Sequence, residues 1–359
     1  MLTDTLKGLK VVELATVLAG PAVGMFFAEL GAEVVKIENK RTGGDPTRGW
    51  KSAHESKEDP ASAYYHSVNW HKQIVFLDLG ESSDRSLLTE YLQSADVLIV
   101  NFKEGDAQKF DLKSSVLLER YPSLIIGEIH GFDSDDRVAY DAVLQAESGM
   151  MSINGNPGDD PLKLPIAFID ILAAHQLKEG VLLALWKREK TGRGAIVSTS
   201  LYQSALASLI NQSSTYLNTN VVPSQLGSLH PNIAPYGEKV LSKDQQPILL
   251  AVGTDGQFRN LCDVLEKQSL STERKYITNA DRVKNRIDLL SELTALFSKQ
   301  DASTVLSKLH QAKVPAAKIR KLDEVLNDSP AKEMVLEQVE PNGKISKRMA
   351  TIAFKIERI

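Results

Sequence analysis

The sequence predicts an α/β protein in which a large unit with a Rossmann-like open parallel sheet is joined to a smaller α+β unit. Three observations support this fold class: a strand–helix–strand pattern opens the chain, further strands alternate with helices, and a polar stretch at 218–237 interrupts the pattern. The length of 359 residues also exceeds what one hydrophobic core usually organises. Two units are therefore expected.

The opening pattern is a βαβ unit. Residues 9–14 are an apolar run typical of a buried strand, and Pro21 follows at a position suited to the first turn of a helix. Apolar side chains then recur at i, i+3, i+4 and i+7 before a glycine that suits a helix C-terminus: Val23, Phe26, Phe27, Leu30 and Gly31. Residues 32–38 predict a second strand. Such a short unit implies parallel strands with a right-handed crossover.

The remaining elements divide the chain into domains. Strands are predicted at 74–79, 97–100, 124–129 and 248–252, and helices at 87–93, 171–190, 202–217, 257–265, 286–299 and 302–312. Proline, glycine, serine and asparagine concentrate between the two groups of elements. We therefore predict a large domain over 1–217, a linker over 218–237, a small α+β domain over 238–329, and a C-terminal segment, 330–359, that returns to the large domain.

Composition excludes several classes of protein. The formal net charge of -4 arises from 42 basic and 46 acidic residues without a basic block, so nucleic acid is not an expected partner. Cys262 is the only cysteine, which excludes an intrachain disulfide and a cysteine metal cluster, and its apolar helical surroundings predict a core thiol. No export-type start and no apolar run of bilayer length is present. The sequence predicts a cytoplasmic protein without a metal or a membrane partner.

The first βα turn argues against a dinucleotide site. Its sequence, Ala-Gly-Pro-Ala-Val-Gly at 19–24, lacks the G-x-G-x-x-G that brings the backbone close to a pyrophosphate. Binding of NAD is accordingly disfavoured.

Several segments instead resemble the class III CoA-transferases (CaiB/BaiF type), the group of formyl-CoA transferase and carnitine CoA-transferase. The resemblance runs in the order of that family from about residue 9 to about residue 329. It is carried by L-A-G-P at 18–21, L-G-A-E-V-V-K-I-E at 30–38, G-D-P-T-R-G-W at 44–50, N-W-H-K at 69–72, Y-D-A-V-L-Q-A-E-S-G at 140–149, T-G-R-G at 191–194, and H-P-N-I-A-P-Y at 230–236.

This resemblance implies an enzyme that moves CoA from an acyl-CoA to a free carboxylic acid. Asp170 matches the catalytic aspartate of the family, which attacks the thioester and passes through an aspartyl-CoA intermediate. Judged by position alone, an aspartate just before a helix is more often an N-cap, and the two roles are compatible. The positive end of the helix dipole is expected to keep the carboxylate ionised. No permanently bound cofactor is implied, because CoA is a substrate.

The resemblance also assigns residues to the two parts of the substrate. Those expected to contact CoA are Val17, Leu18, Ala19, Lys40, Lys72, Asn101, Phe102, Lys109 and Arg137. The cations among them suit the phosphates of CoA, although a surface lysine is more often merely solvated. Those expected to shape the acyl pocket are Trp50, Tyr64 and Tyr140, with packing in the core as the alternative for Trp50. Formyl-CoA transferase covers its aspartate with a mobile poly-glycine loop, and the family often has a polar residue at the position of Leu18. This chain has neither feature, so formyl-CoA and oxalate are not favoured as substrates.

Two functions other than CoA transfer are possible, and the resemblance also implies an assembly state. α-Methylacyl-CoA racemases share this fold but use a histidine–aspartate pair, where this chain has Tyr140-Asp141. A CoA-binding protein without turnover is the other alternative, and retention of Asp170 argues against it. The resemblance further implies a homodimer of interlocked chains.

Overall fold

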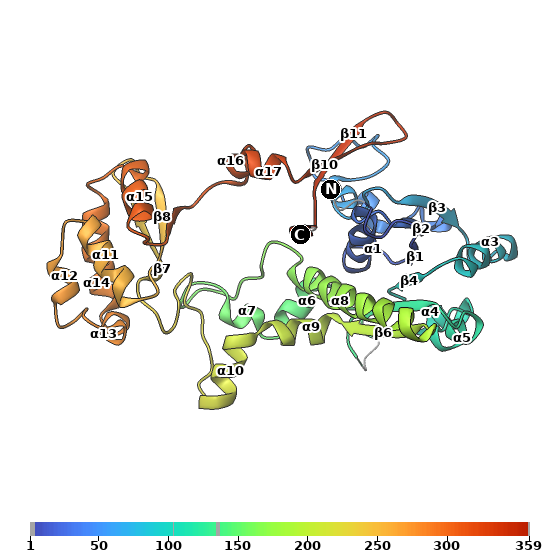
Figure 1. Ribbon diagram of the computed structural model, residues 1–359, viewed down its shortest axis with the longest axis horizontal. Coiled ribbons are helices and arrows are strands. Elements are labelled where there is room, and N and C mark those ends of the chain that lie inside the picture. The colour runs from blue at the N-terminus through green and yellow to red at the C-terminus, as the bar shows by residue number, and fades with distance from the viewer. Residues whose placement is uncertain (1–3, 103, 134–136, 358–359) are drawn as a thin grey trace. The chain divides into compact units, whose positions relative to one another are not determined.

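The computed structural model describes residues 4–102, 104–133 and 137–357. The chain forms two compact units, the first made of 1–151, 163–223 and 332–359, and the second of 152–162 and 224–331 (Figure 1). The sequence assigned 152–162 to the large domain, and this boundary needs correction. In the second unit, the carbonyl of Gly155 accepts the N–H of Gly227 at 2.8 Å, and Gln225 donates to the carbonyl of Asn154 at 3.0 Å.

A six-stranded parallel sheet forms the centre of the first unit. Its order is β3-β2-β1-β4-β5-β6, and its strands are β1 (Lys10–Leu14), β2 (Glu33–Asn39), β3 (Gln73–Leu77), β4 (Val97–Val100), β5 (Ile125–His130) and β6 (Ala195–Ser200). The α/β class and the parallel sheet are confirmed. The strand order changes direction between β1 and β4, and ligands of such sheets bind outside the carboxyl ends of the strands at this point.

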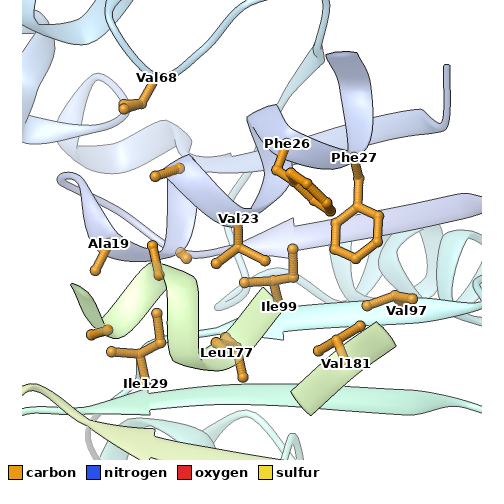
Figure 2. Packing of buried hydrophobic residues seen from close by; sticks show 14 of the residues in the cluster. Ala19, Val23, Phe26, Phe27, Val68, Val97, Ile99, Ile129, Leu177 and Val181 are labelled. Atoms are coloured by element: carbon orange, nitrogen blue, oxygen red, sulfur yellow. The ribbon is translucent and has the colours of Figure 1, made fainter. Parts of the chain in front are cut away.

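Two helices cover one face of this sheet. Helix α1 (Ala19–Glu29) and helix α8 (Phe168–Thr191) pack together on β4 and β5, with Val23 and Phe27 facing Ile99, Leu177 and Val181 (Figure 2). Helices α3 (Ser82–Gln93) and α5 (Ser114–Arg120) bury leucines against the opposite face. The remaining helices of this unit are η1 (Lys40–Thr42), η2 (Pro46–Gly49), α2 (Ala63–His66), α4 (Glu104–Lys109), α6 (Asp141–Glu147), α9 (Leu201–Ser208) and α10 (Ile210–Thr219). Helix α7 (Met150–Ile153) runs across the boundary between the two units.

The last part of the chain belongs to the first unit. Strands β10 (Val335–Val339) and β11 (Ile345–Met349) form an antiparallel hairpin, and β11 packs against α2. Beyond the hairpin, the hydroxyl of Thr351 donates to the carboxylate of Glu29 on α1 at 2.8 Å. The segment after the hairpin therefore contacts α1 of the same unit.

The second unit is a small α+β structure. Its antiparallel sheet has the order β7-β8-β9, with β7 (Tyr236–Leu241), β8 (Pro247–Ala251) and β9 (Ala316–Lys318). Its helices are α11 (Asp255–Val264), α12 (Ser269–Thr272), α13 (Asn279–Lys284), α14 (Arg286–Phe297), α15 (Ala302–Gln311), α16 (Leu322–Leu326) and α17 (Ser329–Lys332), the last of which leads back to the first unit. Cys262 is buried in the core of this unit, as predicted.

None of the helices among the described residues combines the length and the apolar character needed to cross a bilayer.

Candidate active site

Asp170 lies at the carboxyl edge of the parallel sheet. Helix α8 ends at the opposite edge, because Gly192 caps it and the N–H of Gly194 then bonds to the carbonyl of Pro122, just before β6 begins. The first turn of α8 is consequently at the edge where the β1–α1 turn also lies. Asp170 is the third residue of the helix, and Ala167 occupies the N-cap. The N-cap interpretation of Asp170 is thus wrong.

The carboxylate of Asp170 is buried, with 8 % of the residue exposed. Burial, helped by the negative charge of Asp141, raises the pKa of Asp170 to about 7. This is the reverse of the ionisation expected from the helix dipole, because loss of hydration outweighs the partial charge of one helix terminus. Near neutral pH, Asp170 is therefore a partly ionised carboxylate with little hydration.

Asp141 holds the start of α8 in place. Its Oδ1 accepts the N–H of Ile169 at 2.7 Å, and its Oδ2 accepts Nε2 of Gln145 at 2.6 Å. Gln145 in turn accepts the N–H of Leu164 at 2.7 Å. The aspartate and glutamine of the Y-D-x-x-x-Q segment thus join α6 to the first turn of α8, where backbone N–H groups lack partners within the helix. Sequence patterns alone assign no structural role to either side chain.

The β1–α1 turn has a strained backbone. Val17 has φ +73°, a conformation that a β-branched residue rarely adopts and that costs of the order of 1–3 kcal/mol. Its N–H donates to the buried carboxylate of Asp45 at 3.2 Å. Asn101, directly after β4, accepts the N–H of Thr16 at 3.1 Å and donates to its carbonyl at 2.9 Å. These bonds join the two strands at the point where the strand order changes direction.

The predicted turn residues and the residues after β4 therefore lie together. Val17 and Leu18 are half-buried, Ala19 is buried at the start of α1, and Asn101 and Phe102 are half-buried on the neighbouring loop. This is the place at which an open α/β sheet binds ligands.

The three aromatic residues predicted to shape the acyl pocket differ in their exposure and their contacts. The rings of Trp50 and Tyr64 make an edge-to-face contact with centroids 5.2 Å apart, and Trp50 is 44 % exposed, which excludes the core-packing alternative within this unit. Burial, followed by the charges of Asp170, Asp141 and Asp45, raises the pKa of Tyr64 to about 12. Its phenol therefore remains a hydrogen-bond donor near Asp170. Tyr140 is exposed at the N-cap of α6, next to Asp141.

Three of the predicted cations follow carboxyl ends of strands. Lys40 comes directly after β2, Lys109 ends the helix that follows β4, and Arg137 lies in the segment after β5. Lys40 and Lys109 are exposed. Arg137 forms an ion pair with Glu147 at 2.8 Å and lies over the ring of Phe132. Lys40 directly after β2 and Arg137 after β5 lie on the side of the sheet that carries Asp170.

Lys72, predicted to contact CoA, has a different role in the structure. It directly precedes β3, so it enters the sheet from the amino end, and its side chain is fully buried. Its ammonium donates to Glu13 at 2.7 Å, to the carbonyl of Pro21 at 2.8 Å and to Asn69 at 3.0 Å, which uses all three of its donors. Burial lowers the pKa of Lys72 to about 8 against the attraction of Glu13. The N-x-x-K segment therefore builds the interior rather than a phosphate site.

Glu13 is a residue that the sequence patterns did not single out. It lies on the α1-facing side of β1, is fully buried, and also accepts Lys36 at 2.8 Å. Gly24 of α1 makes room for it, because a Cβ there would lie 1.8 Å from its Oε2. The signal that could have identified Glu13 is its charge in the middle of an otherwise apolar strand, because buried charges are rare unless they are paired.

The model of the family described as "CoA-transferase family III" matches residues 6–358. The chain belongs to CoA-transferase family III. Among its relatives in this family, the succinate–glutarate CoA-transferase of Agrobacterium fabrum is 34% identical over 330 residues, covering 90% of this chain and 82% of that protein. The succinyl-CoA:mesaconate CoA-transferase of Haloarcula marismortui is 32% identical over 350 residues, covering 94% and 86%.

A solved structure of the family has the same fold. The CaiB/BaiF family protein of Brucella suis aligns with a TM-score of 0.84 and 33% identity, covering 98% of this chain and 93% of that one.

Within this family III chain, neither His130 nor His175 is directed so that it could complete the histidine–aspartate pair of a racemase with Asp170. His130 is the last residue of β5 and alternates with Ile129, which faces α8, so its side chain is on the opposite face of the sheet. There it lies 3.5 Å from Glu128. His175 follows Asp170 by five positions, a rotation of about 140° around the helix, and is exposed. Neither residue faces the carboxylate of Asp170.

Among the described residues there is no group of three or more histidine, cysteine, aspartate or glutamate side chains that could hold a metal ion.

Proposed function

We propose that this chain transfers CoA between an acyl-CoA and a free carboxylic acid, with Asp170 as the nucleophile. The observation that carries the proposal is the burial of Asp170 in the first turn of α8, at the edge of the sheet where Val17 and Asn101 lie. A carboxylate with little hydration is a stronger nucleophile than one in water, and its raised pKa still leaves part of it ionised at neutral pH.

The chemistry needs no proton transfer. One Asp170 oxygen attacks the thioester carbonyl, the C–S bond breaks, and a mixed anhydride and CoA thiolate form. The thiolate then attacks the aspartyl carbonyl and releases the donor acid, which leaves an aspartyl-CoA thioester. The incoming carboxylate attacks that thioester, and the same two steps run in reverse to give the new acyl-CoA and free Asp170. The phenol of Tyr64, whose pKa is raised by burial and in part by the charge of Asp170 so that it stays protonated, would donate to an oxyanion in these steps.

The names of the relatives narrow the substrate class. Those from Agrobacterium fabrum and Haloarcula marismortui are named for succinate, glutarate and mesaconate, all short dicarboxylic acids. We extend this class to the present chain as donor and acceptor. The exposed Trp50 and Tyr140 would line the acyl end, and Lys40, Lys109 and Arg137 would meet the phosphates of CoA.

The homodimer is part of the same proposal. Large apolar side chains are exposed on the outer side of α8 and on α10: Leu183 66%, Trp186 62%, Ile210 72% and Leu217 76%. These side chains are available for contact with another chain. We take this partner to be a second copy of the chain, because the family that the sequence resembles forms interlocked dimers.

The test combines turnover with trapping. The purified protein is incubated with succinyl-CoA and glutarate, new thioesters are measured by mass spectrometry, and a parallel sample is treated with hydroxylamine. We expect glutaryl-CoA and a mass change on the peptide that contains Asp170. The Asp170→Ala variant should lose several orders of magnitude in kcat and all trapping while still binding CoA. Transfer by that variant at the wild-type rate would refute the proposal.

The racemase alternative is tested in the same protein. A 2-methylacyl-CoA is incubated in deuterated water, and deuterium at its α-carbon is measured. We expect none, because the positions of His130 and His175 supply no second base beside Asp170. Rapid deuterium uptake without an adduct on Asp170 would favour the racemase, and CoA binding without either reaction would favour a binding protein.

A further inference from the structure

Three acidic and three basic side chains form a neutral, buried network between β1, β2 and the 44–50 segment. In addition to Glu13 and Lys72, it contains Lys36, Glu38, Asp45 and Arg48. Arg48 holds Glu38 through two bonds of 2.6 and 3.0 Å, and the hydroxyl of Tyr65 donates to the same carboxylate at 2.7 Å. The V-V-K-I-E, G-D-P-T-R-G-W and N-x-x-K segments thus share one structural purpose. The network has the charge balance that buried ions require.

Asp45 is the member of this network that reaches outward. It lies 3.1 Å from the ammonium of Lys36, which also donates to Glu13 and to the carbonyl of Ala15. Burial acts against the charge of Lys36, but Glu13 and Asp45 together raise the pKa of Lys36. The carboxylate of Asp45 is therefore fixed from the inside by a permanent cation.

The same carboxylate makes two sets of bonds on its other side. It accepts the N–H of Val17 at 3.2 Å, in the strained β1–α1 turn. It also accepts the N–H of Thr47 at 3.0 Å and its hydroxyl at 2.7 Å, as the N-cap of η2. Trp50 is the C-cap of that short helix and packs on Tyr64. One buried carboxylate thus joins the turn proposed to hold CoA to the wall proposed to hold the acyl group.

We propose that Asp45 is a positioning residue for CoA transfer: held by Lys36, it keeps Val17 in its left-handed conformation and sets the distance between the CoA turn and the Trp50–Tyr64 wall. The inference rests on the proposed function. Asp45 does not itself contact the reacting atoms. It acts through the backbone of Val17 and through η2, so its loss should disturb the alignment of the thioester with Asp170 more than the binding of CoA.

The test is a double-mutant cycle with Asp45→Asn and Val17→Gly. The carboxamide keeps one acceptor oxygen but removes the charge that Lys36 requires. We expect kcat to fall by about 10²-fold in Asp45→Asn, the usual effect of a displacement of about 1 Å, with a much smaller change in KM for the acyl-CoA. Glycine adopts positive φ without strain, so in the Val17→Gly background the same substitution should cost roughly tenfold less.

Two further variants separate positioning from folding. Thr47→Val removes one hydroxyl donor to Asp45 in a similar volume and should lower kcat in the same direction, by less, with the protein folded. Asp244→Asn is the matched control, because Asp244 in the second unit also accepts a serine hydroxyl and a backbone N–H, from Ser242 and Ala302. It should leave kcat unchanged. Thermal melting of each variant gives the folded fraction by which kcat is divided.

Hydrogen exchange gives a readout that does not depend on activity. The Val17 amide, measured by mass spectrometry on the peptide around 15–18, should exchange faster in Asp45→Asn and at the wild-type rate in Asp244→Asn. Wild-type exchange and kcat in folded Asp45→Asn would overturn the inference, and so would strictly additive effects of the two substitutions. Faster exchange in a protein that transfers CoA to none of the acids would support the positioning of Val17 and refute the proposed function.

Discussion

The carboxylate of Asp141 accepts the N–H of Ile169 at 2.7 Å and, one residue before Asp170, adds a second negative charge to the first turn of α8. The two aspartates have different partners. Asp141 is held by the helix N–H and by Gln145, whereas the pKa of Asp170 is raised by burial and by its neighbour. Environment thus separates two identical functional groups into one that supports the helix and one whose pKa is raised to about 7.

Asp141→Asn should move the pH profile of transfer to lower pH. Asp170 must be ionised to attack, so activity rises as pH passes upward through its pKa of about 7. Removing the charge of Asp141 lowers that pKa, while the amide oxygen still accepts the Ile169 N–H. The measurement is kcat/KM from pH 5 to 9. Asp78→Asn, which alters a carboxylate that accepts the N–H of Gly80, is the control, and an unmoved acid limb in Asp141→Asn would contradict the prediction.

Asp170→Asn should stabilise the fold at alkaline pH. The folded-state pKa of Asp170, about 7, lies above its ordinary value of 3.8, so the folded protein binds the proton more tightly than the unfolded chain does. Its contribution to stability is complete below pH 3.8 and is lost as pH rises through 7. The neutral amide avoids this loss, which is at most about 4 kcal/mol. Urea unfolding at pH 8 and pH 4 checks this, and an equal difference at both values would contradict it.

Gly24→Ala should destabilise the protein although alanine is the better helix former. Helix propensity alone predicts a gain of about 1 kcal/mol. A methyl group at this position would lie 1.8 Å from Glu13 Oε2 and displace a buried charge, which should cost at least about 2 kcal/mol. Gly256→Ala on α11 is the matched control, since its nearest neighbours are 3.8 Å away. Thermal melting should order the proteins as Gly256→Ala at or above wild type and Gly24→Ala below it.

Lys72 and Lys40 should separate stability from CoA binding. Lys72→Met leaves Glu13 with one cation fewer in the interior and should cost about 3–5 kcal/mol of unfolding free energy, with little change in Kd for CoA per folded molecule. Lys40→Ala, on the surface after β2, should change stability by less than about 0.5 kcal/mol. It should weaken CoA binding by about 1.5–3 kcal/mol. Calorimetric titration with CoA measures the binding. Weaker CoA binding in Lys72→Met together with unchanged binding in Lys40→Ala would disprove both assignments.

The protein should sediment as a homodimer at all concentrations at which it is folded. Exposed Leu183, Trp186 and Ile210 leave much apolar surface for a partner, and interlocked chains do not separate on dilution. Trp186→Glu should lower the yield of dimer, whereas Ile287→Glu, at an even more exposed apolar site on the second unit's α14, serves as the comparison. A folded monomer at nanomolar concentration in the wild type would refute the prediction.

Local patterns predicted the large unit well where burial is complete. Strand β4 has the predicted bounds because all four of its residues are buried and apolar. Strand β6 was missed, since it is an edge strand whose residues alternate between half-buried and exposed without a strong apolar set. The hairpin of β10 and β11 was missed for a related reason: its strands pair with each other, and the two of their residues that are buried, Ser346 and Arg348, are polar.

The candidate site was predictable only as far as position in the chain determines position in the fold. Asp170 and Asn101 follow strands of a parallel sheet, so their common edge follows from the βαβ pattern. Lys72 was wrongly predicted to contact CoA, because a sequence motif identifies the neighbours of a residue in the chain but not the direction of its side chain. The pKa of Asp170 depends on Asp141, which reaches it through a contact between α6 and α8 that local periodicity cannot contain.

The bond between Thr351 and Glu29 spans 322 positions of the sequence, and this sets an order of events during synthesis. At the usual ribosomal speed, α1 leaves the ribosome roughly 15 to 65 seconds before the segment that binds its last residue. The second unit is complete in the meantime, since its residues end at 331. The unit that begins first is therefore the unit that finishes last, and α1 and α2 keep part of their surface uncovered until β11 and Thr351 have been synthesised.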